Sequence, residues 1–570
     1  MNAPIKKQWI IDSSSKHIPT QVQDELIEYP LLLRQLLFNR GITTAEDART
    51  YLLAKGSLHD PFQLLNMDKA VERILQAVDA QEMMIVYGDY DVDGVTATAL
   101  LVESLQAIGG DVRAYIPNRF DEGYGLNLDA LKTLREEGAR LVITVDCGVR
   151  SPKEVAYANE LGMDMIISDH HEPGGTPPEA FAVINPKQTG DAYPYRDLAG
   201  VGVAFKIAEA LFTKRQPVDL HLEDLLDLVA VGTVADIVPL TRENRSLVKA
   251  GLEILAMGKR PGLWSLAQVA GVNIERISAE QIGFLLGPRL NAAGRLDTAK
   301  LAYELLVSQD ILEAGRLAQQ LDDKNKERQE ITRSIQETAE ERAKADGNDF
   351  LIFAADESFN EGVVGLAASR LAEAYYRPAI VAHKGDEETR ASCRSIPVFH
   401  ITRALDHCAD LLVRHGGHSM AAGFTVRNQD LEELVIRLRD LAADQLSGQV
   451  LQPELHADME LSLQNPKEIF EAMEKIEPTG EKNPGVRFVS RGLWVKRFSA
   501  VGKDKTHLKL QVSDGRTVFD AIAFRMGHWA ENMPSRVDLL YSYDINTFNG
   551  RTTVQLMVRD IQAYEPDPLA

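Results

Sequence analysis

Four short apolar runs between residues 83 and 168 alternate with stretches of helical pattern. The runs are residues 83–87, 112–116, 141–145 and 165–168, and the helical stretches include residues 96–108 and 152–161. Buried strands that alternate with helices are typical of βαβ units, whose parallel strands share one sheet. The sequence therefore predicts an α/β fold with a parallel-sheet domain, which we place at residues 71–306.

Polar residues follow three of these runs at the point where each strand should end. The cluster GDYDVDG (88–94) follows the first run, Asp146 follows the third, and Asp169-His170-His171 follows the fourth. Because the carboxyl ends of parallel strands meet at one edge of the sheet, these side chains should gather in one crevice. Three carboxylates within five residues repel one another unless a cation is present. The sequence therefore predicts a metal site at this edge.

The acidic cluster also has a structural interpretation, because Asp is common in turns and at helix N-caps. Capping requires only one carboxylate, so metal binding is the favoured hypothesis. If the strand continued through the cluster, Asp89, Asp91 and Asp93 would point the same way, and Gly94 would turn the chain into the helix from residue 96. Asp236, a lone acid in an apolar stretch, needs a partner if it is buried.

Two further motifs near this site have competing interpretations. Cys147 is a possible nucleophile, but no base is assigned to it and a packing role is favoured. Gly200-Val201-Gly202 resembles part of a dinucleotide loop, yet it lacks the third glycine and the acidic partner of that motif. We expect these glycines to allow close helix packing.

The rest of the chain predicts three more segments after an N-terminal extension at residues 1–70. Residues 307–345 have dense mixed charge and sparse apolar residues at helical spacing, which predicts a long connecting helix. A second, smaller α/β domain is expected at 346–450, with strands at 350–354 and 379–382, a helix at 363–376 and a turn at Gly416-Gly417-His418. Short alternating runs from 451 to 570 predict an all-β domain, which we expect to be a barrel.

Charge and cysteine content limit the classes of function. The net charge of −22 argues against nucleic acid as a partner of the whole surface, but residues 482–516 hold nine Lys and Arg against two acids. Aromatic residues accompany this basic segment, a combination with which β-barrel domains hold single strands. Three scattered cysteines and the lack of a long apolar run predict a cytoplasmic protein with no membrane partner.

The motifs together resemble those of the DHH phosphoesterase family. GDYDVDG (88–94), TVDCG (144–148), SDHH (168–171) and VADIVPL (234–240) are similar to its four motifs, in the same order. Further segments resemble signatures of its single-strand-specific exonucleases: GPRLNAAGRL (287–296), EGVVGLAASRL (361–371), RASCRS (390–395) and GGHSMAAGF (416–424). The resemblance covers roughly residues 45–565. It implies a DHH domain, a DHHA1-like domain and an OB-like domain.

The resemblance also implies roles for individual residues. Two divalent ions, Mn²⁺ or Mg²⁺, would be held by Asp89, Asp91, Asp93, Asp146, His170 and Asp236, with Asp146 bridging them. Asp169 would orient the histidines, and His171 would contact the phosphate or assist proton transfer, so that His171 and Asp146 are the catalytic residues. The residues expected to bind DNA are Arg289, Asn291, Arg295, Arg390, Ser392, Arg394, Gly416, Gly417 and His418. Relatives carry a His where this chain has Asn360, so no role of that His is transferred.

The expected function is two-metal cleavage of single-stranded DNA from the 5′ end to mononucleotides in repair and recombination. Candidate partners are a single-strand-binding protein and a helicase, and the protein is expected to be a monomer. Two alternatives remain open. One is a DHH phosphodiesterase that acts on short oligonucleotides or cyclic dinucleotides. The other is a non-catalytic replication-fork scaffold, which the presence of the acids and His170 disfavours.

Overall fold

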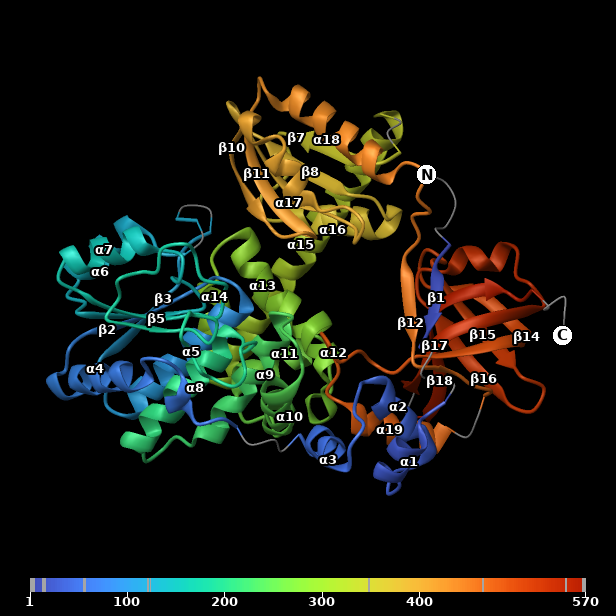
Figure 1. Cartoon of the computed structure of the whole chain (residues 1–570), viewed down its shortest axis with the longest axis horizontal. Helices are drawn as coiled ribbons and strands as arrows, with labels where there is room; N and C mark the ends of the chain where they lie inside the picture. Colours follow the sequence, from blue (N-terminus) through green and yellow to red (C-terminus); the bar gives the residue numbers. More distant parts are fainter. Residues whose placement is uncertain are drawn as a thin grey trace.

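The computed structural model describes residues 6–12, 17–54, 58–119, 122–123, 125–346, 349–463, 466–548 and 551–565. Figure 1 shows two α/β units, joined by a long helix, and a separate β-barrel. The N-terminal segment begins beside the barrel and then reaches the first α/β unit (Figure 1). Among the described residues, no helix has both the length and the apolar character needed to cross a membrane.

The first α/β unit is built on a five-stranded parallel sheet. Its strands are β2 (Met84–Gly88), β3 (Val112–Tyr115), β4 (Leu141–Val145), β5 (Asp164–Ser168) and β6 (Ala182–Ile184), in the order β3-β2-β4-β5-β6. This confirms the four strands expected from the apolar runs. β6 was not anticipated, because its three residues are too few to give a periodic signal.

Helices cover both faces of this sheet, and alternate residues of each strand face opposite sides. Helices α4 (Met67–Ala80), α5 (Val92–Ala107) and α8 (Gly200–Lys214) pack on one face, around Val86, Ile143 and Ile166. Helices α6 (Leu128–Glu136) and α7 (Pro152–Glu160) pack on the other, around Val142 and Ile167. The strands are therefore buried on both sides, and only their ends can offer polar groups to a ligand.

A helical layer continues from the sheet to the connecting helix. It contains α9 (Leu226–Ala235), α10 (Arg242–Ala256), α11 (Pro261–Val269), α12 (Ala279–Gln281), the π-helix Ile282–Leu286, α13 (Gly287–Leu296) and α14 (Lys300–Val307). The long helix α15 (Ile311–Asp346) has 36 residues. Leu317 and Leu321 in its first half pack into the first unit, and Ile335 and Ala339 in its second half pack into the second. One helix therefore links two hydrophobic cores.

The second α/β unit has a mixed sheet. Its strands are β7 (Ile352–Asp356), β8 (Ala379–Lys384), β9 (Glu388–Arg394), β10 (Leu412–Gly417) and β11 (Ala421–Arg427), in the order β10-β11-β9-β8-β7. Its helices are α16 (Val364–Tyr375), α17 (Ile401–Asp406) and α18 (Leu431–Leu446). The expected turn at Gly416-Gly417-His418 is shifted: both glycines end strand β10, where Gly416 pairs with Gly423 and Gly417 with Ala422. Pairing with β11 extends β10 through the glycines, so the reversal follows them.

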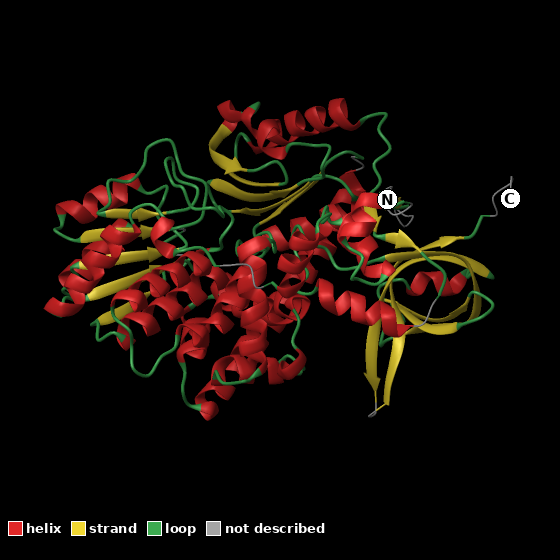
Figure 2. Ribbon diagram, turned by 60° about the horizontal axis from the view of Figure 1, so that its bottom comes forward, coloured by secondary structure: helices red, strands yellow, loops and turns green. Residues whose placement is uncertain are grey.

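The C-terminal domain is a closed barrel, which Figure 2 shows end-on as a ring of strands. Its strands are β13 (Met459–Glu460), β14 (Phe488–Val501), β15 (His507–Ser513), β16 (Val518–Ala523), β17 (Arg536–Phe548) and β18 (Arg551–Ala563). Pairing of β14 with β17 closes it. The all-β expectation is thus confirmed, and closure removes exposed strand edges.

The N-terminal segment packs against this C-terminal domain. β1 (Gln8–Ile11) forms a parallel pair with β12 (Glu454–Ala457). Helices α1 (Thr20–Glu25), α2 (Leu31–Asn39) and α3 (Ala45–Leu53) follow, and α2 packs against α19 (Pro466–Ile476), where Leu33 and Leu37 share its hydrophobic core. The two ends of the sequence therefore form one structural body.

Candidate active site

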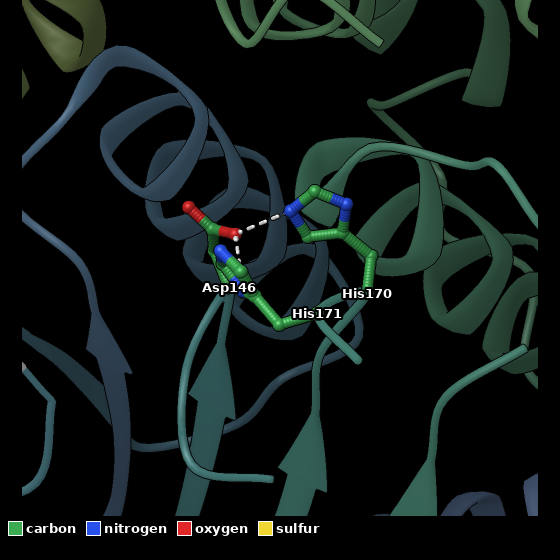
Figure 3. A group of neighbouring side chains, drawn as sticks. All are labelled: Asp146, His170 and His171. Carbon is green, nitrogen blue, oxygen red and sulfur yellow. Dashed lines mark ion pairs between the residues drawn. The ribbon is translucent and has the colours of Figure 1, made fainter. Parts of the chain in front are cut away.

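The carboxyl ends of β2, β4 and β5 bring the predicted acids and histidines together. Asp146 directly follows β4, and His170 lies two residues beyond β5. His170 Nε2 is 3.0 Å from Asp146 Oδ1, 3.6 Å from Asp236 Oδ2 and 3.8 Å from Asp93 Oδ2. Figure 3 shows Asp146 beside both histidines, with an ion pair from one carboxylate oxygen to each of the rings of His170 and His171. Three segments distant in sequence thus converge on the imidazole of a fourth.

Three overlapping groups of side chains have the arrangement needed to hold a metal ion. In each group the ligand atoms lie within 4.8 Å of one another. The groups are Asp146, His170 and His171; Asp93, His170 and Asp236; and Asp89, Asp91 and Asp146. Asp146 and His170 each belong to two groups, so the site offers adjacent positions for more than one cation.

The acidic cluster does not continue the strand, contrary to the alternation considered above. β2 ends at Gly88 and α5 begins at Val92, four residues before the expected start. Asp91 is the N-cap of α5 and accepts a hydrogen bond from the Gly94 N–H at 3.1 Å. Asn291 Oδ1 accepts the Val92 N–H at 3.2 Å. These two acceptors satisfy N–H groups of the first turn, which explains the early helix start.

Asp93 is held by the amino-terminal end of α8. The Gly200 N–H donates to Asp93 Oδ2 at 2.6 Å, and the Val201 N–H donates to Asp93 Oδ1 at 2.8 Å. A Cβ atom at Gly200 would lie 2.7 Å from Asp146 Cβ. Gly200 therefore allows the expected close helix packing, which places α8 against two of the candidate ligands, whereas a Cβ atom at Gly202 would make only ordinary contact with Leu198.

Asp169 orients the histidines from behind. Asp169 Oδ1 accepts the N–H groups of His170 and His171 at 2.7 and 3.0 Å and lies 2.8 Å from His171 Nδ1. Burial alone would lower the pKa of His171, but the hydrogen bond and the charge of Asp169 outweigh burial and raise it. A protonated His171 beside the acidic cluster suits contact with a phosphate oxygen.

Burial and mutual repulsion hold protons on the carboxyl groups in the metal-free site. Burial, followed by the charge of Asp91, raises the pKa of Asp93 to about 7. Burial, followed by Asp93, raises the pKa of Asp236 to about 9, and the same two causes raise that of Asp146. Burial and His171 lower the pKa of His170 to about 3, which keeps its imidazole neutral and able to ligate.

The unpaired atoms of the site fit divalent ions. Asp89 Oδ1, Asp146 Oδ1 and both ring nitrogens of His170 are buried and make no hydrogen bond of normal geometry among the described residues, although Asp146 Oδ1 and His170 Nε2 lie 3.0 Å apart. Each such atom costs about 1–3 kcal/mol if nothing binds it. Carboxylate oxygens with a neutral imidazole are suitable ligands for Mn²⁺, and carboxylates for Mg²⁺. The residues present therefore fit the expected Mn²⁺ or Mg²⁺.

We expect metal binding to stabilise this protein more at high pH than at low pH. The raised pKa values of Asp93 and Asp236 mean that the metal-free fold loses stability as pH rises from about 4 through about 7 and 9. A cation needs the deprotonated carboxylates and so reverses this trend. Thermal unfolding with Mg²⁺ or with chelator, at about pH 6 and about pH 8.5, measures the difference. A metal-induced increase in Tm that is equal at both pH values would contradict the assignment.

The predicted DNA-binding residues of α13 lie at the edge of this site, and each has an internal partner, although that of Arg295 is only a long contact of 3.5 Å from Nη1 to the Gly362 carbonyl. Arg289 Nε contacts Asp322 Oδ1 of α15 at 2.9 Å, and Asn291 binds the Val92 N–H described above. The Arg295 guanidinium is half-buried, and burial with the charges of Arg119 and Arg328 lowers its pKa to about 10. Arg295 therefore fits a phosphate-binding role best, whereas Arg289 and Asn291 also position α13 and α5.

The predicted residues of the second unit share one face of β9. Arg390, Ser392 and Arg394 alternate with the buried residues Ala391 and Cys393. Arg390 Nη1 contacts Glu361 Oε2 at 3.1 Å, and Arg394 donates to the Cys393 carbonyl at 2.9 Å. The exposed His418 follows Gly417 at the neighbouring end of β10. This face therefore presents guanidinium groups and a hydroxyl, which are suitable donors for a phosphate.

Sequence reasoning missed Arg119 and Tyr90. The Arg119 guanidinium lies over the Tyr90 ring, 5.1 Å from its centroid, and its charge acts on both Asp89 and Arg295. Arg119 follows the predicted strand at 112–116, so its place at the carboxyl edge of the sheet was a usable signal. Arg328, in the middle of α15, gave no such signal because its helix is charged all along its length.

Comparison with known proteins identifies the domains. Residues 83–233 match the DHH family N-terminal domain, residues 347–444 match the DHHA1 domain, and residues 457–560 match the RecJ OB domain. The chain is 38% identical to the single-stranded-DNA-specific exonuclease RecJ of Bacillus subtilis over 567 residues, which are 98% of this chain and 71% of that protein. It is 37% identical to the RecJ of Escherichia coli, over 94% of this chain and 96% of that protein.

Solved structures show the same likeness. The crystal structure of RecJ from Thermus thermophilus in complex with Mn²⁺ has a TM-score of 0.82 and 29% sequence identity, and the match covers 98% of this chain and 80% of that chain. A second RecJ structure, bound to manganese, has a TM-score of 0.59 and 35% identity over 67% of this chain and 95% of that chain. Both RecJ structures contain manganese, which the carboxylate and imidazole groups described above are suited to bind.

Proposed function

The chain belongs to the RecJ family of single-stranded-DNA-specific exonucleases, and we propose that it degrades a single strand from its 5′ end and releases mononucleotides. It is a metal-dependent enzyme with Mn²⁺ or Mg²⁺ as its cofactor. The observation that carries the proposal is the convergence of Asp93, Asp146 and Asp236 on His170. When bound, divalent ions supply a hydroxide nucleophile and stabilise the leaving oxygen of the scissile phosphodiester.

The protein side chains have separate tasks in this proposal. The residues that would hold the ions are Asp89, Asp91, Asp93, Asp146, His170 and Asp236, and Asp146 would be shared because it belongs to two of the ligand groups. Asp169 fixes the ring of His171 through Nδ1. His171, whose pKa is raised by that contact, neutralises a phosphate oxygen or gives a proton to the leaving oxygen.

A series of arginines supports a path for the strand from this site to the barrel. Burial and the positive charges of Arg119 and Arg328 lower the pKa of Arg295. Burial and Arg370 lower the pKa of Arg328, and burial and Arg525 lower that of Arg370. The five residues come from the loop after β3, from α13, α15 and α16, and from the residues after β16. Neighbouring guanidinium groups repel one another unless an anion lies between them, so we propose that DNA phosphates bind along this series.

The barrel has the features of a single-strand-binding surface. Phe488 and Phe519 are buried in its core, whereas Trp494 and Phe498 are 46% and 47% exposed. Both exposed rings lie on β14, next to Lys496 and Arg497. Exposed aromatic rings with cations can stack bases and hold phosphates without reading sequence. This domain favours a long strand over a dinucleotide as the substrate.

We further propose that the enzyme acts as a monomer in the cytoplasm. One copy supplies every side chain of the metal groups, so the reaction needs no second subunit. Cys147, Cys393 and Cys408 are free thiols, which fits a reducing compartment. The space between the two α/β units, which α15 connects, would be wide enough for a single strand and too narrow for a duplex.

The test is a cleavage assay with end-labelled DNA and Mn²⁺. We expect a 5′-labelled single strand to release labelled mononucleotide at the earliest times, and a 3′-labelled strand to shorten gradually. A blunt duplex of the same sequence should be cut at least ~100-fold more slowly, because unpairing its end costs a few kcal/mol. Equal cleavage of duplex and single strand would contradict the proposed exclusion of duplex by width. Early release of labelled mononucleotide from the 3′-labelled strand would contradict the proposed polarity.

A further inference from the structure

A buried arginine joins the first α/β unit to the barrel domain. Arg245 lies in α10, is 2% exposed and donates Nη1 to the Pro478 carbonyl at 2.6 Å and Nη2 to the Glu477 carbonyl at 2.9 Å. Its Nε donates to the Tyr51 carbonyl at 3.1 Å, and its guanidinium lies 4.1 Å from the centroid of the Tyr51 ring. One side chain therefore holds α10, the N-terminal segment and the barrel domain together. We call this set of contacts the Arg245 junction.

The partners of Arg245 also bind one another. The Tyr51 hydroxyl donates to Asn483 Oδ1 at 2.7 Å, and Asn483 Nδ2 donates to the Pro478 carbonyl at 2.8 Å. Figure 1 shows α3, which carries Tyr51, beside α10 and near α19. A guanidinium has a fixed fork of donors, so the three close carbonyls around it, with a fourth from Lys475 at 3.5 Å, define one orientation of the domains. Loss of this fork would leave those buried carbonyls unpaired.

The junction lies next to the segment that carries a candidate metal ligand. Asp236 ends α9, and α10 begins at Arg242. Between them, the Leu240 N–H donates to the Glu481 carbonyl of the barrel domain at 2.8 Å. A Cβ atom at Gly480 would lie 2.7 Å from Leu240 Cδ1, so the two segments are in close contact. The barrel domain thus touches the chain four residues after Asp236.

The backbone of this segment is strained. Ile237 has φ +63° and Arg242 has φ +43°. Positive φ is a true outlier for a β-branched residue, and such strain persists only where surrounding contacts impose it. The contacts that flank Ile237 are the Asp236 N–H to the Gly232 carbonyl on one side and Leu240 with Glu481 on the other. The strained Ile237 therefore lies between Asp236 and the contact of Leu240 with the barrel domain.

We infer that Arg245 is a positioning residue that fixes the barrel domain to the Asp236 segment, so that a strand bound by the barrel reaches the metal site in a fixed register. The inference rests on the proposed function. It assigns no contact with DNA to Arg245, which is buried. Its consequence is that a strand long enough to touch both the barrel and the metal site gains affinity from their fixed separation, whereas a trinucleotide gains none.

The test compares long and short substrates of the Arg245→Met variant. Met keeps most of the apolar volume and removes the donors. We expect the KM for a strand of about 30 nucleotides to rise roughly tenfold, while its kcat and the kcat/KM for a trinucleotide stay within about twofold. Arg245→Lys should be intermediate, because one ammonium cannot serve three carbonyls. Tyr51→Phe, which removes the hydroxyl contacts with Asn483 and with the Ile476 carbonyl, should shift KM in the same direction by less.

Two controls separate the inference from general damage. Arg260 is also buried and forms ion pairs with Glu103 and Asp227, all within the first unit. Arg260→Met should change kcat/KM for the long strand and for the trinucleotide by the same factor. A distance measurement between spin labels at Lys259→Cys and Lys467→Cys should broaden in Arg245→Met, and the three native cysteines are buried and should not be labelled.

The outcomes are distinct. The inference is wrong if Arg245→Met changes kcat/KM for the long strand and for the trinucleotide by the same factor. It is also wrong if the distribution of distances between the spin labels stays as narrow as in the native protein. In either case Arg245 is only a stabilising residue. If the native protein cleaves neither substrate with Mn²⁺, the proposed function itself fails. The positioning role is supported if KM rises for the long strand while kcat/KM for the trinucleotide stays unchanged, and if the distribution of label distances broadens.

Discussion

Asp146→Asn is expected to lower kcat by ~10³-fold or more at saturating Mn²⁺, because the loss of a shared metal ligand removes several kcal/mol of transition-state stabilisation. Asp146 Oδ1 lies 3.0 Å from His170 Nε2 and 3.8 Å from His171 Nδ1. Asn has the same shape but no charge. Asp146 has φ +64°, and Asn tolerates this conformation better than Ala does. The variant therefore tests the charge without adding backbone strain.

The stability of Asp146→Asn distinguishes a metal ligand from a structural residue. In the metal-free protein, burial and the charges of Asp93, Asp91, Asp89 and Asp236 raise the pKa of Asp146, so its ionised form is unfavourable there. Replacing it should leave the metal-free Tm unchanged or higher, and it should reduce the Tm increase that Mn²⁺ produces. Asp164→Asn is a matched control. Asp164 starts β5 at the opposite edge of the sheet and pairs with Arg73. Retained turnover in Asp146→Asn would refute the metal assignment.

The catalytic sheet was predictable because its strands are nearly continuous apolar runs. Their ends located Asp146 and His170 correctly, since parallel strands must place their carboxyl ends at one edge. The resemblance to the DHH family then added Asp236, which the residues alone left as an acid without a known partner. Arg119 also follows a predicted strand, so the same argument places it at the carboxyl edge of the sheet, although it was not among the predicted site residues.

Long-range contacts set the limits of prediction. Nothing in GDYDVDG shows that Asp93 binds N–H groups of α8, more than 100 residues later in the chain. The early start of α5 depends likewise on Asn291, which a local pattern does not contain. The packing of Leu33 and Leu37 into the barrel domain is another example, because helical periodicity gives the apolar face but not its partner. Local patterns give elements and edges, whereas tertiary contacts decide which side chains meet.

Gly200→Ala is expected to lower kcat/KM by ~10²-fold or more, because an error of about 1 Å in a reacting group can cost that much. The new Cβ would lie 2.7 Å from Asp146 Cβ and 2.8 Å from Asp146 Oδ1, closer than van der Waals contact allows. Asp146 cannot move away easily, because its N–H donates to the Ser168 carbonyl at 3.1 Å and its backbone is already in a left-handed conformation. α8 must therefore shift, and its Gly200 and Val201 N–H groups would lose Asp93.

Gly202→Ala is the matched control on the same helix. A Cβ atom at Gly202 would lie 3.4 Å from Leu198 Cδ2, which is ordinary contact. Ala has a higher helix propensity than Gly by up to about 1 kcal/mol, so this substitution should preserve or raise Tm and leave kcat/KM within about twofold. Calorimetric titration of both variants with Mn²⁺ should show weaker binding for Gly200→Ala alone. If Gly200→Ala binds Mn²⁺ as the native protein does and cleaves DNA at the native rate, close packing of α8 does not position Asp93 and Asp146 for catalysis.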